Sequence, residues 1–188
     1  MKNLKSIALA LVVLISTVSV TAQIKKIDVT KSKIEWIGKK VTGKHNGTVN
    51  FTDGSLTFKK NKLSSGSFTV DMTSLTATDL TGEYKDKLDG HLKADDFFGT
   101  EKFPTASLVF KKIKAVSTSL YTITADLTIK GITKPIIFDL ATKEKTATTT
   151  FNVNRTLYDI KYGSKSFFDS LGDKAISDEF ELNIALNF

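Results

Sequence analysis

Few residues in this chain could carry out chemistry, and histidine is the scarcest of them. The chain has only His45 and His91, and it has no cysteine. A catalytic zinc site needs three protein ligands, and the chain contains neither a His-Glu-x-x-His zinc motif nor a Gly-x-Ser-x-Gly nucleophile motif. We therefore expect a protein that is not an enzyme and that holds no metal and no organic cofactor.

His91 is the more informative histidine because polar residues surround it in the sequence. Asp89 stands two residues earlier and could fix the tautomer of the imidazole by a hydrogen bond. Arg155 and Tyr158 form a second polar group near the C-terminus. We interpret all four as residues that either stabilise irregular structure or contact a bound ligand, because polar side chains outside regular elements usually satisfy backbone groups. A catalytic pocket built from Asp89, His91 and Arg155 is the alternative.

The segment 38–44 resembles a phosphate-binding loop, since it has the Gly-x-x-x-x-Gly-Lys spacing of that motif. His45 follows where the motif requires Ser or Thr to bind Mg²⁺. A strand pattern also comes next, so no helix N-terminus is available to bind a phosphate. We interpret this segment as a basic turn.

The elements that position these residues are predicted to be β-strands, because apolar and polar residues alternate along much of the chain. The clearest alternating runs are 67–72, 121–130 and 180–188. Shorter strands are expected at 34–41, 106–113, 136–140 and 146–153. Asp53-Gly54 between two apolar segments predicts a tight hairpin that pairs Phe51 with Leu56.

Two segments interrupt the alternation and are expected to be irregular. Between 79 and 98, Leu80, Tyr84, Leu88 and Leu92 recur every four residues, which indicates broken helical turns. The segment 163–174 has no regular pattern. We therefore predict an all-β fold, a single eight-stranded antiparallel barrel with short helical cap segments, and a barrel of that size can hold one slender ligand.

The N-terminal segment has the features of an export signal. Lys2 and Lys5 precede an apolar stretch at 7–20, and the small residues before Gln23 suggest cleavage after Ala22. We therefore expect a signal peptide at 1–22, one domain at 23–188, and a periplasmic or secreted location. The formal net charge of +7 favours acidic partners. Nucleic acid is not expected among them, because no basic helix or aromatic-basic motif is present.

Three motifs give the chain a family resemblance. Residues 89–98 (DGHLKADDFF) with 101–106 (EKFPTA), residues 126–135 (DLTIKGITKP) and residues 154–160 (NRTLYDI) together resemble the signatures of the YceI-like, polyisoprenoid-binding family. The sequence departs from the family at Lys87, where Arg is frequent, and at Leu157, where Asp is common. The resemblance implies an extended, lipocalin-like barrel that is often a homodimer and that binds an isoprenoid or another long-chain lipid.

In that interpretation the alternating apolar side chains form a lipid channel. Its expected lining is Trp36, Phe51, Phe58, Phe68, Val70, Met72, Leu127, Ile129, Phe138, Phe151, Leu182 and Ile184. Asp89, His91, Arg155 and Tyr158 would then contact the head group or stabilise the fold, and transient membrane contact is expected of such a carrier. One alternative is a small outer-membrane barrel, because the alternation at 180–188 looks like the C-terminal signal of such proteins. The other is an enzyme acting on a lipid head group.

Overall fold

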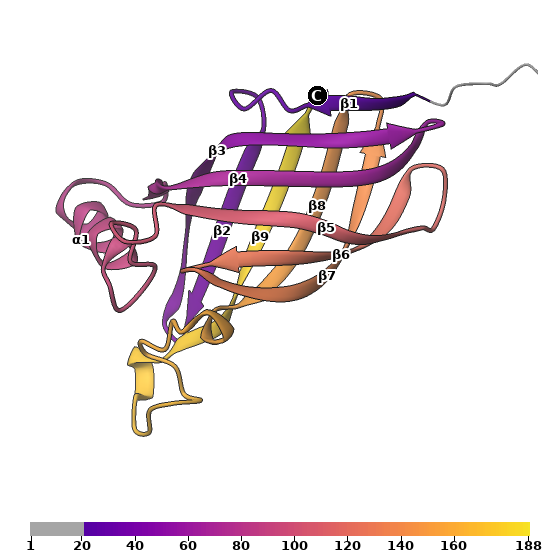
Figure 1. The fold of residues 1–188 in the computed structure, drawn as a ribbon. Helices are drawn as coiled ribbons and strands as arrows, with labels where there is room; N and C mark the ends of the chain where they lie inside the picture. Colours follow the sequence, from indigo (N-terminus) through magenta and orange to yellow (C-terminus); the bar gives the residue numbers. More distant parts are fainter. Residues whose placement is uncertain (1–20) are drawn as a thin grey trace, which may run out of the picture.

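The alternating segments of the sequence form long antiparallel strands in the computed structural model, which describes residues 21–188 (Figure 1). The first four strands are β1 (Ala22–Lys26), β2 (Lys33–Lys40), β3 (Gly43–Lys59) and β4 (Lys62–Ala77). The helix α1 (Gly82–Lys93) follows, and then β5 (Thr105–Ala115), β6 (Leu120–Ile129), β7 (Ile132–Lys143) and β8 (Thr146–Asn154). Two short 3-10 turns, η1 (Arg155–Tyr158) and η2 (Gly172–Lys174), precede β9 (Ile176–Asn187).

The strands close into a barrel of eight with one strand added outside. The pairing order is β1-β3-β2-β9-β8-β7-β6-β5-β4, and a further pairing of β3 with β4 closes the ring. β1 joins only the far part of β3, where Ala22 pairs with Lys59. The predicted eight-stranded antiparallel barrel is therefore confirmed, and β1 is the element that the sequence patterns did not indicate.

The predicted hairpin at Asp53-Gly54 is wrong. Both residues lie within β3, where Asp53 pairs with Thr69 and Gly54 pairs with Phe68 next to a register shift. A Cβ at Gly54 would come within 2.5 Å of the Phe68 ring, so this glycine makes room for a neighbouring side chain. The real turn is Lys60-Asn61, whose φ angles of 49° and 60° fit the left-handed hairpin turn.

The helical segment is one continuous helix and not the broken turns that we expected. α1 runs through Gly90, and a Cβ at this position would meet no atom within 4 Å. Leu92 is buried and Leu88 packs against the core, so tertiary contacts hold a helix that its glycine would weaken. No helix among residues 21–188 is long and apolar enough to cross a membrane.

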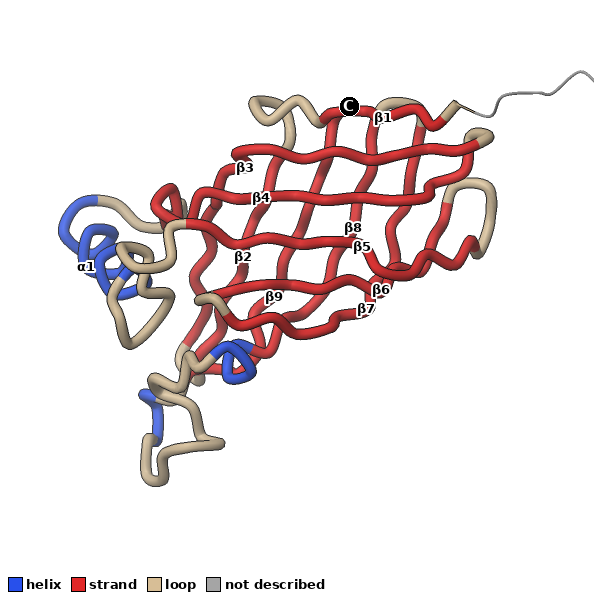
Figure 2. Tube along the Cα trace, viewed as in Figure 1, coloured by secondary structure: helices blue, strands red, loops and turns tan. Residues whose placement is uncertain are grey.

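The helical segments lie at one end of the strands (Figure 2). β7 and β8 pair only beside the hairpin that joins them, where Ala141–Lys143 pair with Thr146–Thr148. Thr149 continues the contact through its side chain, because its Oγ1 donates to the Asp139 carbonyl at 2.6 Å. Beyond that point η1 contacts β7. The predicted irregular segment 163–174 follows η1 and contains only η2, in agreement with the sequence.

The segment that resembles a phosphate-binding loop is a hairpin. Val41 and Thr42 form the turn between β2 and β3, and Lys40 pairs with Gly43 across it. β3 follows directly, so this segment has no helix N-terminus that could bind a phosphate. The interpretation as a basic turn is confirmed.

Candidate binding cavity

An apolar cavity of about 160 Å³ lies inside the barrel. Side chains from β2 to β9 line it, together with Leu92 of α1 and Phe97 and Phe98 of the segment that follows the helix. The strands position these side chains because every second residue points inward. Phe68, Val70 and Met72 of β4 all line the cavity, so these alternating residues share the inner face, as expected.

The expected channel residues reach the cavity with one exception. The lining includes Trp36, Phe51, Phe68, Val70, Met72, Leu127, Ile129, Phe138, Phe151, Leu182 and Ile184. Phe58 does not line it, because this residue lies near the end of the long strand β3, beyond the cavity. There Phe58 packs against Phe188 at a centroid distance of 6.0 Å, and Lys25 Nζ lies 5.0 Å from the centroid of its ring.

Aromatic rings form a continuous band on one side of the cavity. Phe138 stacks on Phe151 at 4.7 Å between centroids, and Phe110 lies 6.1 Å from Phe138 and 5.8 Å from Phe68. Phe110 was missing from the expected channel although it alternates with Ala106 and Leu108, and Phe180 was missing although it continues the alternation of Leu182. Phe97 and Phe98 come from an irregular segment, so no alternation could indicate them.

Arg155 is a buried cation in the cavity wall, with 2% of its surface exposed. Its guanidinium donates to the backbone carbonyls of Ser177, Ile160 and Ile176 at 2.9, 2.8 and 3.1 Å. Burial lowers the pKa of Arg155, and the Asp178 carboxylate opposes this effect. The side chain therefore joins η1 to the start of β9, and its charge lies at the wall of an otherwise apolar space.

Asp89 does not orient His91, contrary to the suggested hydrogen bond. It accepts from Thr76 Oγ1 and from the Ala77 N–H, both at 2.7 Å, and it forms an ion pair with Lys85. Burial alone would raise the pKa of Asp89, but the hydrogen bonds from Lys85, Thr76 and Ala77 outweigh it and hold the pKa below its ordinary range. Asp89 thus fastens α1 to β4.

His91 lies between aromatic rings. Its ring centroid is 5.3 Å from that of Phe97 and 4.4 Å from that of Tyr162. Its Nε2 is buried and has no hydrogen-bond partner in the described structure. Tyr158 is also buried, its hydroxyl has no partner among residues 21–188, and burial raises its pKa to about 12.

Hydrogen bonds do not join the residues of the alternative catalytic pocket in the part of the chain that the structure describes. Within residues 21–188, no hydrogen bond connects Asp89, His91 and Arg155, since Asp89 binds β4 and Arg155 binds backbone carbonyls. No set of three or more His, Asp or Glu side chains in the described chain is placed to hold a metal ion. The arrangement supports packing of α1 and η1 against the barrel.

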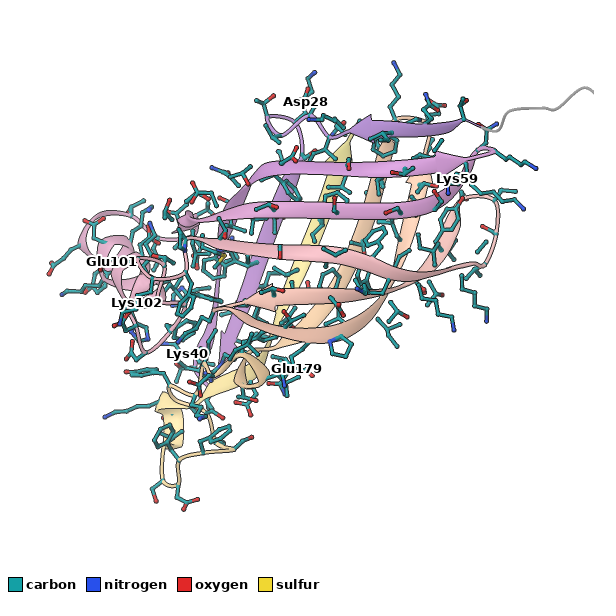
Figure 3. The ribbon with its side chains drawn as sticks, viewed as in Figure 1. Asp28, Lys40, Lys59, Glu101, Lys102 and Glu179 are labelled. Atoms are coloured by element: carbon teal, nitrogen blue, oxygen red, sulfur yellow. The ribbon has the colours of Figure 1, made fainter. Side chains whose placement is uncertain are left out.

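The cavity approaches the surface at the end of the barrel near η1. Its exposed lining residues are Lys39, Ser177 and Glu179, which belong to the end of β2 and the start of β9. Figure 3 shows Lys40 and Glu179 at this end and Lys59 at the other. A closed β-barrel with an apolar cavity open at one end defines a class of protein that encloses apolar molecules.

Comparison with known proteins specifies the family. The profile of the YceI-like domain matches residues 25–188, so the chain belongs to the YceI-like family. A UPF0312 protein of Photorhabdus laumondii is 33% identical over 93 residues, which are 50% of this chain and 46% of that protein. Protein YceI of Escherichia coli is 32% identical over 93 residues, again 50% and 46% of the two chains. The chain thus spans about half the length of the curated relatives it matches.

Solved structures show the same fold. BcnA of Burkholderia cenocepacia superposes with a TM-score of 0.69 at 20% identity, over 85% of this chain and 98% of that one. A polyisoprenoid-binding domain from Saccharophagus degradans, implicated in plant cell wall breakdown, gives a TM-score of 0.58 at 16% identity, over 89% and 97%.

Proposed function

We propose that this protein is a non-catalytic carrier that encloses the tail of an isoprenoid or a similar long-chain lipid in its barrel. The observation that supports this most directly is the cavity, whose wall consists almost entirely of apolar side chains from the strands and the cap. The fold is shared with a polyisoprenoid-binding domain of Saccharophagus degradans. We expect no turnover of the ligand, because no hydrogen bond joins Asp89, His91 and Arg155 within residues 21–188.

The gain from enclosing a tail is large for each carbon, about 0.8 kcal/mol per methylene group removed from water. A cavity of about 160 Å³ is similar in size to a cavity of about 150 Å³ that holds a single benzene molecule. A long tail therefore needs more room than this cavity offers. We infer that lining side chains move aside on binding, or that part of the tail extends through the exposed end beside Glu179.

This role fits a periplasmic or secreted protein. It is also compatible with a homodimer. Lys2, Lys5 and the apolar stretch at 7–20 support export, and they lie outside the described residues. The proposed cleavage after Ala22 would fall at the first residue of β1. Lipid is the expected partner, and nucleic acid is not.

A small outer-membrane barrel is the alternative, and it would need its apolar residues on the outside. The alternating residues Leu182, Ile184 and Leu186 instead line the cavity. This orientation favours the carrier.

Native mass spectrometry of protein purified from its own host, followed by lipid extraction, tests the proposal. We expect a bound species that carries a long apolar chain and is recovered unchanged after prolonged incubation. A protein that is empty as purified and does not take up polyprenol or long-chain quinone from detergent would contradict the carrier role. Conversion of the bound species to a product would place the protein among enzymes.

A further inference from the structure

The segment 159–175, here called the mouth loop, exposes aromatic rings at the open end of the cavity. Phe167 and Phe168 are adjacent, and each is 50% exposed. The other phenylalanines of residues 21–188 are buried or partly buried. Tyr162 in the same loop is 47% exposed. Leu157 and Val41, on either side of the loop, are exposed as well. Figure 1 shows the mouth loop extending beyond the barrel at this end.

The mouth loop is built to present these rings. Ser164 is fully buried, and its carbonyl accepts hydrogen bonds from the N–H groups of Phe167 and Phe168 at 3.2 and 3.0 Å. Ser166 Oγ donates to Asp178 Oδ2 at 2.5 Å. The Ile176 N–H donates to the Gly163 carbonyl at 2.8 Å. The turn is therefore fixed at both ends, and its fixed backbone directs two phenyl rings towards solvent.

One cation lies close to the Phe167 ring. Lys161 Nζ lies 5.3 Å from the centroid of the Phe167 ring, within the range of a cation–π contact. The turn between β2 and β3 adjoins the loop, since the Val41 N–H donates to the Ala175 carbonyl at 3.3 Å. Apart from the buried Arg155, residues 38–45 and 155–179 contain six Lys and five Asp or Glu, so this surface has a formal excess of one positive charge. Aromatic rings flanked by lysines are typical of segments that enter the interfacial layer of an anionic bilayer.

The mouth loop begins and ends beside residues that line the cavity. Arg155, which precedes the mouth loop, and Ile176, Ser177 and Glu179, which follow it, line the cavity. An apolar tail that leaves the cavity at this end would emerge beside Lys39, Ser177 and Glu179, next to the mouth loop. A bilayer in contact with these rings would receive the tail without passing it through water.

We propose that the mouth loop and the β2–β3 turn form a membrane-docking surface that places the cavity opening on an anionic lipid bilayer. Phe167 and Phe168 enter the interface, and Lys39, Lys40, Lys161, Lys165 and Lys174 contact the lipid phosphates. This inference deepens the proposed function, because docking explains how a tail enters the cavity. Docking itself is measurable on vesicles that contain no specific ligand.

The test places a fluorescent reporter on the surface. Phe168→Trp is compared with Val116→Trp, because Val116 is similarly exposed (56%) and lies in the β5–β6 turn at the opposite end of the barrel. Each variant is mixed with phosphatidylethanolamine and phosphatidylglycerol vesicles with brominated acyl chains, and the signal of the native Trp36 is subtracted. We expect quenching of the new tryptophan in F168W and not in V116W. Equal quenching in both variants, or none in F168W, would overturn the docking surface.

A second measurement separates docking from tail binding. The double variant Phe167→Ser/Phe168→Ser should bind a polyprenol supplied in detergent as well as the unchanged protein does, and should take it up more slowly from vesicles. If F168W is quenched but no variant binds polyprenol, docking stands and the carrier proposal fails. If the double variant loads from vesicles at the unchanged rate, the docking proposal fails. A change in oligomeric state in the double variant, with no quenching in F168W, would assign the rings to a second copy of the chain and overturn membrane docking.

Discussion

The Arg155 guanidinium lies over the ring of Phe97, 5.7 Å from its centroid, and connects η1 to the segment that follows α1. Phe97 in turn packs against His91 and Phe98. One buried cation therefore links the C-terminal turn, the start of β9 and the segment after α1. His91 and Arg155, which belong to motifs far apart in the sequence, therefore both pack against Phe97.

Replacement of Arg155 should destabilise the fold in a graded way. Arg155→Ala leaves three backbone carbonyls without their donor, and we expect a loss of about 3–5 kcal/mol in the free energy of unfolding. Arg155→Lys keeps the charge but cannot reach all three carbonyls, so its loss should be smaller. Urea unfolding followed by Trp36 fluorescence measures both. If the lysine variant were as stable as the wild-type protein, the carbonyl contacts would not contribute to stability.

Tyr158 should make the fold sensitive to alkaline pH. Its pKa rises from 10.0 to about 12 on folding, so its contribution to stability is complete below pH 10 and is lost as the pH rises towards 12. The loss reaches about 1.4 kcal/mol near pH 11. Tyr158→Phe removes this term, and it should be nearly neutral at pH 7 because the hydroxyl has no partner among residues 21–188. Unfolding of both proteins at a series of pH values tests this, and parallel alkaline losses would contradict the assignment.

Two glycines should respond to alanine in opposite ways. A Cβ at Gly47 would lie 1.9 Å from the Thr76 carbonyl oxygen and 2.5 Å from Trp36 Cζ2, so Gly47→Ala should cost about 1–3 kcal/mol or more. A Cβ at Gly90 meets nothing within 4 Å, and Gly90→Ala should stabilise α1 by about 0.5–1 kcal/mol. Thermal unfolding of the two variants is the measurement. A stable G47A protein would mean that β2, β3 and β4 pack differently there.

The cavity face is tested by neighbouring residues on β4. Val70 lines the cavity, whereas Thr69, the preceding residue of the same strand, does not. Val70→Asp places a carboxylate among apolar groups, which costs several kcal/mol or forces the group to stay neutral. We expect V70D to abolish lipid retention or folding and T69D to leave both nearly unchanged. Lipid extraction and circular dichroism distinguish the outcomes, and similar behaviour of the two variants would mean that the inner face is misassigned.

The sequence alone determined the class of fold and most of the cavity wall. Alternation with a period of two residues is a local property, so the runs at 67–72, 121–130 and 180–188 identified β4, β6 and β9 and their inner faces. The family motifs at 89–106, 126–135 and 154–160 agreed with the family profile, which matches residues 25–188.

Tertiary packing determined the structure at the positions where it competes with local sequence signals. Asp53-Gly54 has the sequence of a turn, but Phe68 and Ile27 occupy the space beside Gly54 and keep β3 extended. Asp89 lies close to His91 in the chain, but the helix directs it to Thr76 and Lys85. Phe97 and Phe98 reach the cavity only because α1 and Arg155 hold them there. These contacts join residues far apart in the chain, and no local pattern encodes which distant atoms will fill a given space.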